Sequence, residues 1–305
     1  MSLATYRSIK SHLFILKLAL AAVLFTFSYQ AWSNETKQNG GKDNITYERI
    51  ISLAPHITEL VYSAGAGEKL VGVVEYSDFP IAAQKLPVVG NSATINIESI
   101  IKLAPDLVIA WKSGNRIQDI KRLQSLGFEV WQTEIHQLED IPNFIKTIGE
   151  KAGTVKTARV KSSELLNILK DTTQQYANQT AINAFYEIWH QPLMTMNSKQ
   201  FISLALDTCQ ANNIFADLPL LASEVNLESV IQQDPQVILL GGESAFQESW
   251  YQDWLRYTEL KAIKNQQIYK LDNDKYQRPT ARLIEALPEL CKTIDKARKH
   301  YEQNP

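Results

Sequence analysis

The chain has 305 residues, 45% of them hydrophobic, and a formal net charge of −2. This length and apolar content can bury one large core or two moderate ones. Because no basic stripe interleaved with aromatic residues is present, the composition argues against a nucleic-acid partner.

Residues 1–33 differ in character from the rest of the chain. Their only charged side chains are basic and precede an apolar run and a small-residue segment: Arg7, Lys10 and Lys17, then Leu18 to Phe27, then Ala31-Trp32-Ser33. This pattern predicts a secretory signal peptide cleaved after Ser33 and an exported product. A membrane anchor is the alternative, but the apolar run is shorter than the roughly 20 residues of a bilayer span. Residues 34–44 are polar and aperiodic, which predicts a disordered leader over residues 34–47.

In the first expected lobe, residues 48–153, patterns typical of buried strands occur at 49–53, 70–74, 107–111 and 128–131, with a helix at 57–64. Helices are expected between most of these strands, and this alternation favours a mostly parallel sheet.

Residues 154–176 contain no Gly or Pro, which predicts one long helix within a linking segment at 154–180. Its apolar residues include Val160, Leu165, Leu166 and Leu169. A single helix of this length would join the two lobes as a stiff rod, so closure around a ligand should be small.

The second expected lobe, residues 181–305, repeats the plan. Strands are expected at 184–189, 237–240 and 267–271, a helix at 201–210, and a final helix at 283–301 that breaks or kinks near Pro288. The fold class is therefore α/β, with two Rossmann-like lobes of mostly parallel strands joined by one long helix.

A degenerate repeat supports two lobes of similar design. Segment 95–109 recurs at 225–239, with Asn, Glu, Ser, Ile and Pro at matching positions. Each copy predicts a short helix, a turn at proline and a buried strand. Because this spacing is far wider than a solenoid period of roughly 20–50 residues, it indicates duplicated lobes.

Ligands of open α/β sheets gather beyond the carboxyl ends of the strands, so the residues that end or follow each strand are the candidate binding residues. They mix aromatic and hydrogen-bonding groups and include Pro55, His56, Tyr76, Asp78, Trp111, His190, Tyr276 and Arg278. Such walls suit a large, flat ligand with peripheral amides. Core packing is the plainer interpretation of any single aromatic residue in this set.

No catalytic motif is present: the sequence has no Gly-x-Ser-x-Gly, no His-Glu-x-x-His and no phosphate-binding glycine loop. We therefore expect no enzyme activity, no catalytic residues, no resident metal and no cofactor. The competing hypothesis is a metal-dependent hydrolase that uses His56, His190 and Asp78. The only cysteines, Cys209 and Cys291, suggest one disulfide in an exported chain, with two separate buried thiols as the alternative.

Four segments resemble the periplasmic cobalamin-binding proteins, which belong to the rigid-helix substrate-binding proteins of ABC importers. They are Ser52-Leu-Ala-Pro-His-Ile-Thr-Glu-Leu60, Glu75-Tyr-Ser-Asp-Phe-Pro80, Pro105-Asp-Leu-Val-Ile-Ala-Trp111 and Cys209-Gln-Ala-Asn-Asn-Ile-Phe215. The similarity continues to Cys291 and covers nearly the whole mature chain.

This resemblance implies a monomer that carries cobalamin as transported ligand and delivers it to an ABC transporter permease. It implies corrin contacts from Tyr76 and Trp111, a further wall with Tyr276 and Arg278, and a place for Trp189 in the second lobe. Cys209 and Cys291 match the disulfide pair of the family.

The resemblance also gives Glu98 and Glu228 a role, because matching carboxylates of the family dock on arginines of the permease. The plainer interpretation is an acidic residue that complements a helix N-terminus. One departure concerns the ligand: Gly90-Asn91-Ser92-Ala93 stands where the family often presents a tryptophan. A siderophore or haem is therefore the alternative cargo.

Overall fold

The computed structural model describes residues 46–91 and 94–304, and Thr46–Pro305 form one compact unit. The expected signal peptide lies outside the described residues, as does most of the expected leader. Tyr47, at the end of that leader, donates its backbone N–H to the carbonyl of Lys151 at 2.9 Å and so belongs to the first lobe.

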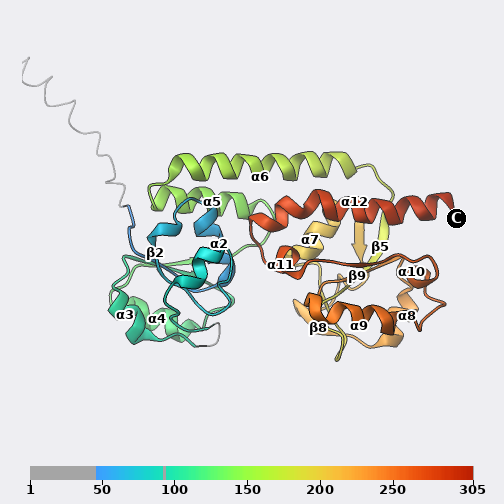
Figure 1. The fold of residues 1–305 in the computed structure, drawn as a ribbon, viewed down its shortest axis with the longest axis horizontal. Coiled ribbons are helices and arrows are strands. Elements are labelled where there is room, and N and C mark those ends of the chain that lie inside the picture. The colour runs from blue at the N-terminus through green and yellow to red at the C-terminus, as the bar shows by residue number, and fades with distance from the viewer. Residues whose placement is uncertain (1–45, 92–93, 305) are drawn as a thin grey trace, which may run out of the picture. The chain divides into compact units, whose positions relative to one another are not determined.

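The first lobe is built on a parallel sheet in the order β2-β1-β3-β4 (Figure 1). Its strands are β1 (Ile50–Ser52), β2 (Leu70–Gly72), β3 (Leu107–Trp111) and β4 (Val130–Thr133). Its helices are α2 (Pro55–Ser63), η2 (Gly67–Lys69), η3 (Ile81–Lys85), α3 (Ile97–Leu103), α4 (Ile117–Ser125) and α5 (Asp140–Lys151). Strand β4 lies two residues later than expected, because a turn at Gly127 first leads the chain out of α4.

The second lobe has a parallel sheet in the order β10-β9-β5-β7 and a small antiparallel ribbon of β6 and β8. The strands are β5 (Ile182–Glu187), β6 (Met194–Met196), β7 (Ala211–Asn213), β8 (Ala222–Glu224), β9 (Val237–Leu240) and β10 (Ile268–Lys270). The helices are α7 (Phe201–Thr208), α8 (Leu227–Gln233), α9 (Ser244–Trp254), α10 (Lys261–Lys264), α11 (Asn273–Tyr276) and α12 (Ala281–Gln303). The predicted α/β class with two parallel sheets is confirmed.

The sequence repeat corresponds to a structural repeat. Helices α3 and α8 have the same length, and each begins at an asparagine whose side chain accepts the backbone N–H of a serine: Asn96 from Ser99 at 2.9 Å and Asn226 from Ser229 at 2.7 Å. Each helix ends in a left-handed residue with φ of 44° and is followed by a strand buried along nearly all its length. Strands with both faces covered are apolar throughout, as β3 and β9 are.

Helix α6 (Val155–Tyr176) connects the lobes, as expected from its sequence, and packs on α5 and on α12 (Figure 1). Its 22 residues span about 33 Å. The buried stripe consists of Ala158, Ser162, Leu165, Leu169, Thr172 and Tyr176. Leu165 and Leu169 lie on this stripe, whereas the apolar side chains of Val160 and Leu166 lie off it and are exposed.

Helix α12 closes the fold and is tied to α7 by the disulfide between Cys209 and Cys291, which confirms the predicted pair. Of the two alternatives expected near Pro288, a break is excluded, since α12 continues as one helix through that residue. Among the described residues, no helix has both the length and the apolar character to cross a membrane.

Candidate ligand-binding site

The predicted binding residues follow parallel strands, so those of each lobe lie at one edge of its sheet. Residues after β1, β2 and β3 contribute Pro55, His56, Tyr76 and Trp111; residues after β5 and β10 contribute Trp189, His190, Tyr276 and Arg278. The two edges meet directly where the guanidinium of Arg278 contacts the carboxylate of Asp78 at 2.5 Å.

Trp111, at the end of β3, is held in place from three sides. Its indole Nε1 donates to Glu134 Oε1 at 3.0 Å, and its backbone N–H donates to Asn115 Oδ1 at 2.7 Å. The ring of His56 meets it edge-on, with centroids 5.1 Å apart. Glu134 was not among the predicted residues, although the strand-end rule would have found it directly after β4.

His56 lies in the second position of α2, after Pro55, and is buried. Burial disfavours the charged imidazolium, and the positive charge of Arg278 adds to this effect, so the pKa of His56 falls to about 4. At neutral pH His56 is therefore a neutral ring packed against Trp111 and does not act as a cation.

Tyr76 presents its side chain outward from the loop after β2. It is 77% exposed, and its backbone has a φ of 63°, in the left-handed region that non-glycine residues rarely occupy. The neighbouring Ser77 is buried and accepts a hydrogen bond from the Thr58 hydroxyl at 3.1 Å. The loop is thus fixed while the phenol ring remains free to stack on a ligand.

Trp189 lies after β5, half exposed, and donates its indole N–H to the carbonyl of Gln191 at 2.9 Å. Its ring meets those of Trp250 and Phe246 at centroid distances of 6.1 and 6.4 Å. These three rings, with His190, line a cavity of about 280 Å³. Trp250 and Phe246 come from α9, a helix that the sequence interpretation missed.

His190 is held between two carboxylates beneath this aromatic wall. Its Nδ1 lies 2.6 Å from Glu187 Oε1, its Nε2 lies 3.3 Å from Asp253 Oδ2, and its ring stacks on Trp250. Glu187 is fully buried, and its other oxygen accepts the indole N–H of Trp254 at 2.6 Å. The hydrogen bond to Glu187 raises the pKa of His190, and this effect exceeds the opposing effect of burial.

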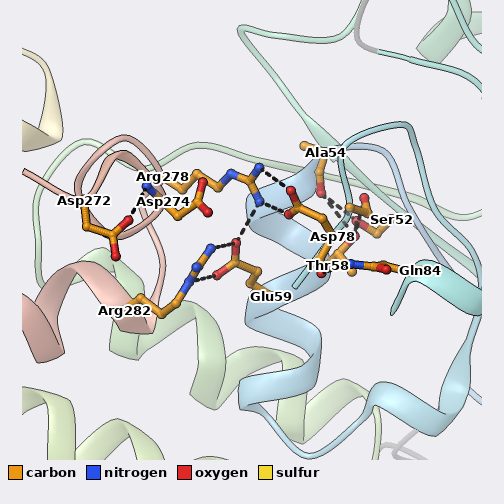
Figure 2. A network of polar contacts seen from close by, with 11 residues as sticks. Ser52, Ala54, Thr58, Glu59, Asp78, Gln84, Asp272, Asp274, Arg278 and Arg282 are labelled. Carbon is orange, nitrogen blue, oxygen red and sulfur yellow. Dashed lines mark hydrogen bonds and ion pairs between the residues drawn. The ribbon is translucent and has the colours of Figure 1, made fainter. Parts of the chain in front are cut away.

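Of the predicted residues in the second lobe, Arg278 forms ion pairs with the first lobe and Tyr276 is buried. Arg278 reaches out of the second lobe to Asp78 and to Glu59 of α2 (Figure 2). Tyr276 is only 2% exposed, and its hydroxyl donates to the carbonyl of Ala286 at 3.3 Å. A ligand contact from Tyr276 would therefore require its ring to leave this packing.

The three residues of the hydrolase hypothesis have separate partners. His56 packs on Trp111, Asp78 pairs with Arg278, and His190 lies between Glu187 and Asp253. In the described part of the chain, no group of three or more His, Cys, Asp or Glu residues could hold a metal ion. The segment that departs from the family pattern includes Ser92 and Ala93, which lie outside the described residues.

Glu98 and Glu228 occupy the second position of α3 and of α8 and are both exposed. One turn later each helix presents an isoleucine, Ile101 or Ile231, that is nearly half exposed. Residues three apart share a helix face, so each lobe presents a carboxylate beside an apolar side chain.

Two parallel α/β lobes joined by one helix, with aromatic walls at the strand ends, define a two-lobed solute-binding protein. The sequence model of the periplasmic binding protein family matches residues 50–275, and the chain belongs to this family.

Individual relatives agree with this assignment. The chain is 36% identical over 252 residues to the vitamin B12-binding protein of Vibrio cholerae, covering 83% of this chain and 91% of that protein. The vitamin B12-binding protein of Vibrio parahaemolyticus is 31% identical over 256 residues, covering 84% of this chain and 92% of that protein.

Solved structures extend the comparison. The crystal structure of the periplasmic vitamin B12-binding protein of Vibrio cholerae superimposes with a TM-score of 0.77 at 35% identity, covering 83% of this chain and 98% of that one. A periplasmic haem-binding protein in complex with two haems gives a TM-score of 0.73 at 17% identity, covering 83% and 99%. At that identity, the second match shows a shared fold alone.

Proposed function

We propose that this protein captures a corrinoid of the vitamin B12 type in the periplasm and delivers it to the permease of an ABC transporter. The observation that carries this proposal is the 36% identity to the vitamin B12-binding protein of Vibrio cholerae over most of both chains. The proposal requires no chemistry on the ligand.

The geometry of the first wall supports binding of a large flat ring. Trp111 is already oriented by Glu134, Asn115 and His56, so little side-chain entropy is lost when a ligand stacks on it. Tyr76 offers a second exposed aromatic face in the same lobe, and Trp189 offers one in the other lobe. Because His56 is neutral, this wall avoids burying a cation under an apolar ring.

Calorimetry of the mature protein with cyanocobalamin tests this proposal. We expect one ligand per chain, and Trp111→Ala should weaken binding at least tenfold, about 1.4 kcal/mol, since a stacking face is removed. Trp131→Phe is the matched control, because Trp131 stacks on Phe144 in the same lobe. Tight binding of haem or a ferric siderophore in place of cyanocobalamin would reject the ligand assignment.

Delivery would use the paired faces of α3 and α8. Glu98 and Glu228 would pair with cations of the permease, while Ile101 and Ile231 would contact apolar surface beside them. A permease that binds both lobes through the same contacts must present two similar surfaces, each with a cation beside an apolar patch. The structural equivalence of α3 and α8 supports this arrangement.

The double variant Glu98→Ala with Glu228→Ala tests docking separately from capture. Its affinity for cyanocobalamin should equal that of the unmodified protein, while binding to the permease and uptake should be lost. Uptake at the unmodified rate would remove the docking proposal.

The proposal also includes export of the protein and a monomeric state. Export depends on residues 1–33, which carry three basic side chains ahead of an apolar run. N-terminal sequencing of the periplasmic protein should find a mature chain that begins at Asn34. A product that retains residue 1 and sediments with membranes would contradict cleavage, and size-exclusion chromatography checks the monomer.

A further inference from the structure

Glu59 is a buried carboxylate whose partners all come from the opposite lobe. It lies in the middle of α2, a helix of the first lobe, and its side chain is only 2% exposed. Every hydrogen bond and ion pair that the structure shows for this side chain involves Arg278 or Arg282. A buried carboxylate without such partners would be strongly destabilising.

The contacts form a continuous chain across the two lobes (Figure 2). Arg282, in the first turn of α12, binds Glu59 through two hydrogen bonds of 2.9 and 2.6 Å, the geometry of a two-pronged ion pair. Arg278 donates to Glu59 at 3.2 Å and to both carboxylate oxygens of Asp78, at 2.5 and 3.2 Å. The guanidinium of Arg282 also lies over the ring of Phe79, 4.1 Å from its centroid.

This ion-pair cluster of Glu59, Asp78, Arg278 and Arg282 is directly continuous with the candidate binding wall. Asp78 follows the exposed Tyr76 by two residues in one loop, so a displacement of Asp78 would move the aromatic face. Behind the cluster, residues of α2, α6 and α12 line a cavity of about 280 Å³. The lobes therefore have unfilled space beside this contact, and within it the ion pairs of Glu59 are the polar link between them.

We propose that Glu59 is a positioning residue, and that its pairing with Arg278 and Arg282 fixes the separation of the two ligand-binding walls. The cluster holds the empty protein at the spacing that receives the ligand, and it must open before the lobes part and release it. The ligand in this inference is taken from the proposed function, whereas the role of Glu59 in lobe separation does not depend on that function.

The test measures lobe separation and ligand release independently. Spin labels on cysteines introduced at the exposed Lys121 of α4 and Lys264 of α10 report the distance between the lobes in the empty protein. In Glu59→Gln, which removes the charge at nearly constant volume, we expect a longer and broader distance distribution. Dissociation of cyanocobalamin should become about tenfold faster. Lys69→Gln, which breaks the Lys69–Glu48 pair within the first lobe, should change neither the distance between the labels nor the dissociation rate.

Charge-swap rescue separates this role from a general loss of stability. The variant Glu59→Arg with Arg282→Glu should recover most of the original distance, whereas either single reversal should not. If Glu59→Gln fails to fold, Asp78→Asn replaces it, because that carboxylate is half exposed. An unchanged distance in a folded variant would overturn the proposal. Absence of cyanocobalamin binding together with a changed distance would reject the ligand and leave the positioning role intact.

Discussion

The disulfide between Cys209 and Cys291 should be a major source of stability in the second lobe. It joins the end of α7 to the middle of α12 across 82 residues, and both cysteines are fully buried. Closing a loop of that length lowers the entropy of the unfolded chain by about 15 cal/mol/K, or about 4.5 kcal/mol at 25 °C. We expect Cys209→Ala with Cys291→Ala to lose most of this amount.

Urea unfolding followed by circular dichroism measures the effect. With a slope of about 3 kcal/mol/M for a chain of this size, the midpoint should fall by about 1.5 M. The unmodified protein treated with a reductant is the control and should approach the midpoint of the variant. A fall of less than about 0.3 M would show that packing of α7 on α12, and not loop closure, holds this lobe together.

Three further predictions concern polar groups that are buried or partly buried. Because Glu187 raises the pKa of His190, folding favours the protonated ring: this stability is complete below the unfolded pKa of about 6.5 and is lost as pH rises through the folded pKa. Thermal melting from pH 5.5 to 8.5 should therefore decline more in the unmodified protein than in His190→Gln, and parallel curves would contradict this. Glu134→Ala should weaken cyanocobalamin binding about fivefold in calorimetry by releasing the indole of Trp111, while an unchanged affinity would show that Glu134 does not orient it. Arg298→Met should cost about 2–4 kcal/mol in urea unfolding, since the buried carbonyl of Cys209 and the carbonyl of Thr180 lose a charged donor and Asp295 loses an ion-pair partner; a loss under 1 kcal/mol would mean that water replaces it.

Some residues of the candidate site could be predicted from the sequence, and others could not. The strand-end rule predicted from the sequence that Trp111, Tyr76 and His56 lie at one edge of the first sheet, because parallel strands align their carboxyl ends. It missed Glu187 and the aromatic residues of α9. Trp250 and Trp254 lie four residues apart, a helical spacing that could have indicated this helix. The contact of Glu187 with His190 carries no comparable pattern.

The sequence by itself determined the features that depend on neighbouring residues: the capped helices at Asn96 and Asn226, the buried strands that follow them and the uninterrupted helix α6. Capping, periodicity and chain stiffness act over a few residues, so they can be predicted locally. Only the tertiary structure decided which charges meet. Arg278 and Asp78 are 200 residues apart, and their contact exists because the packing of the two lobes places their strand-end loops against each other. The same long-range packing buried Tyr276 and left Tyr76 exposed.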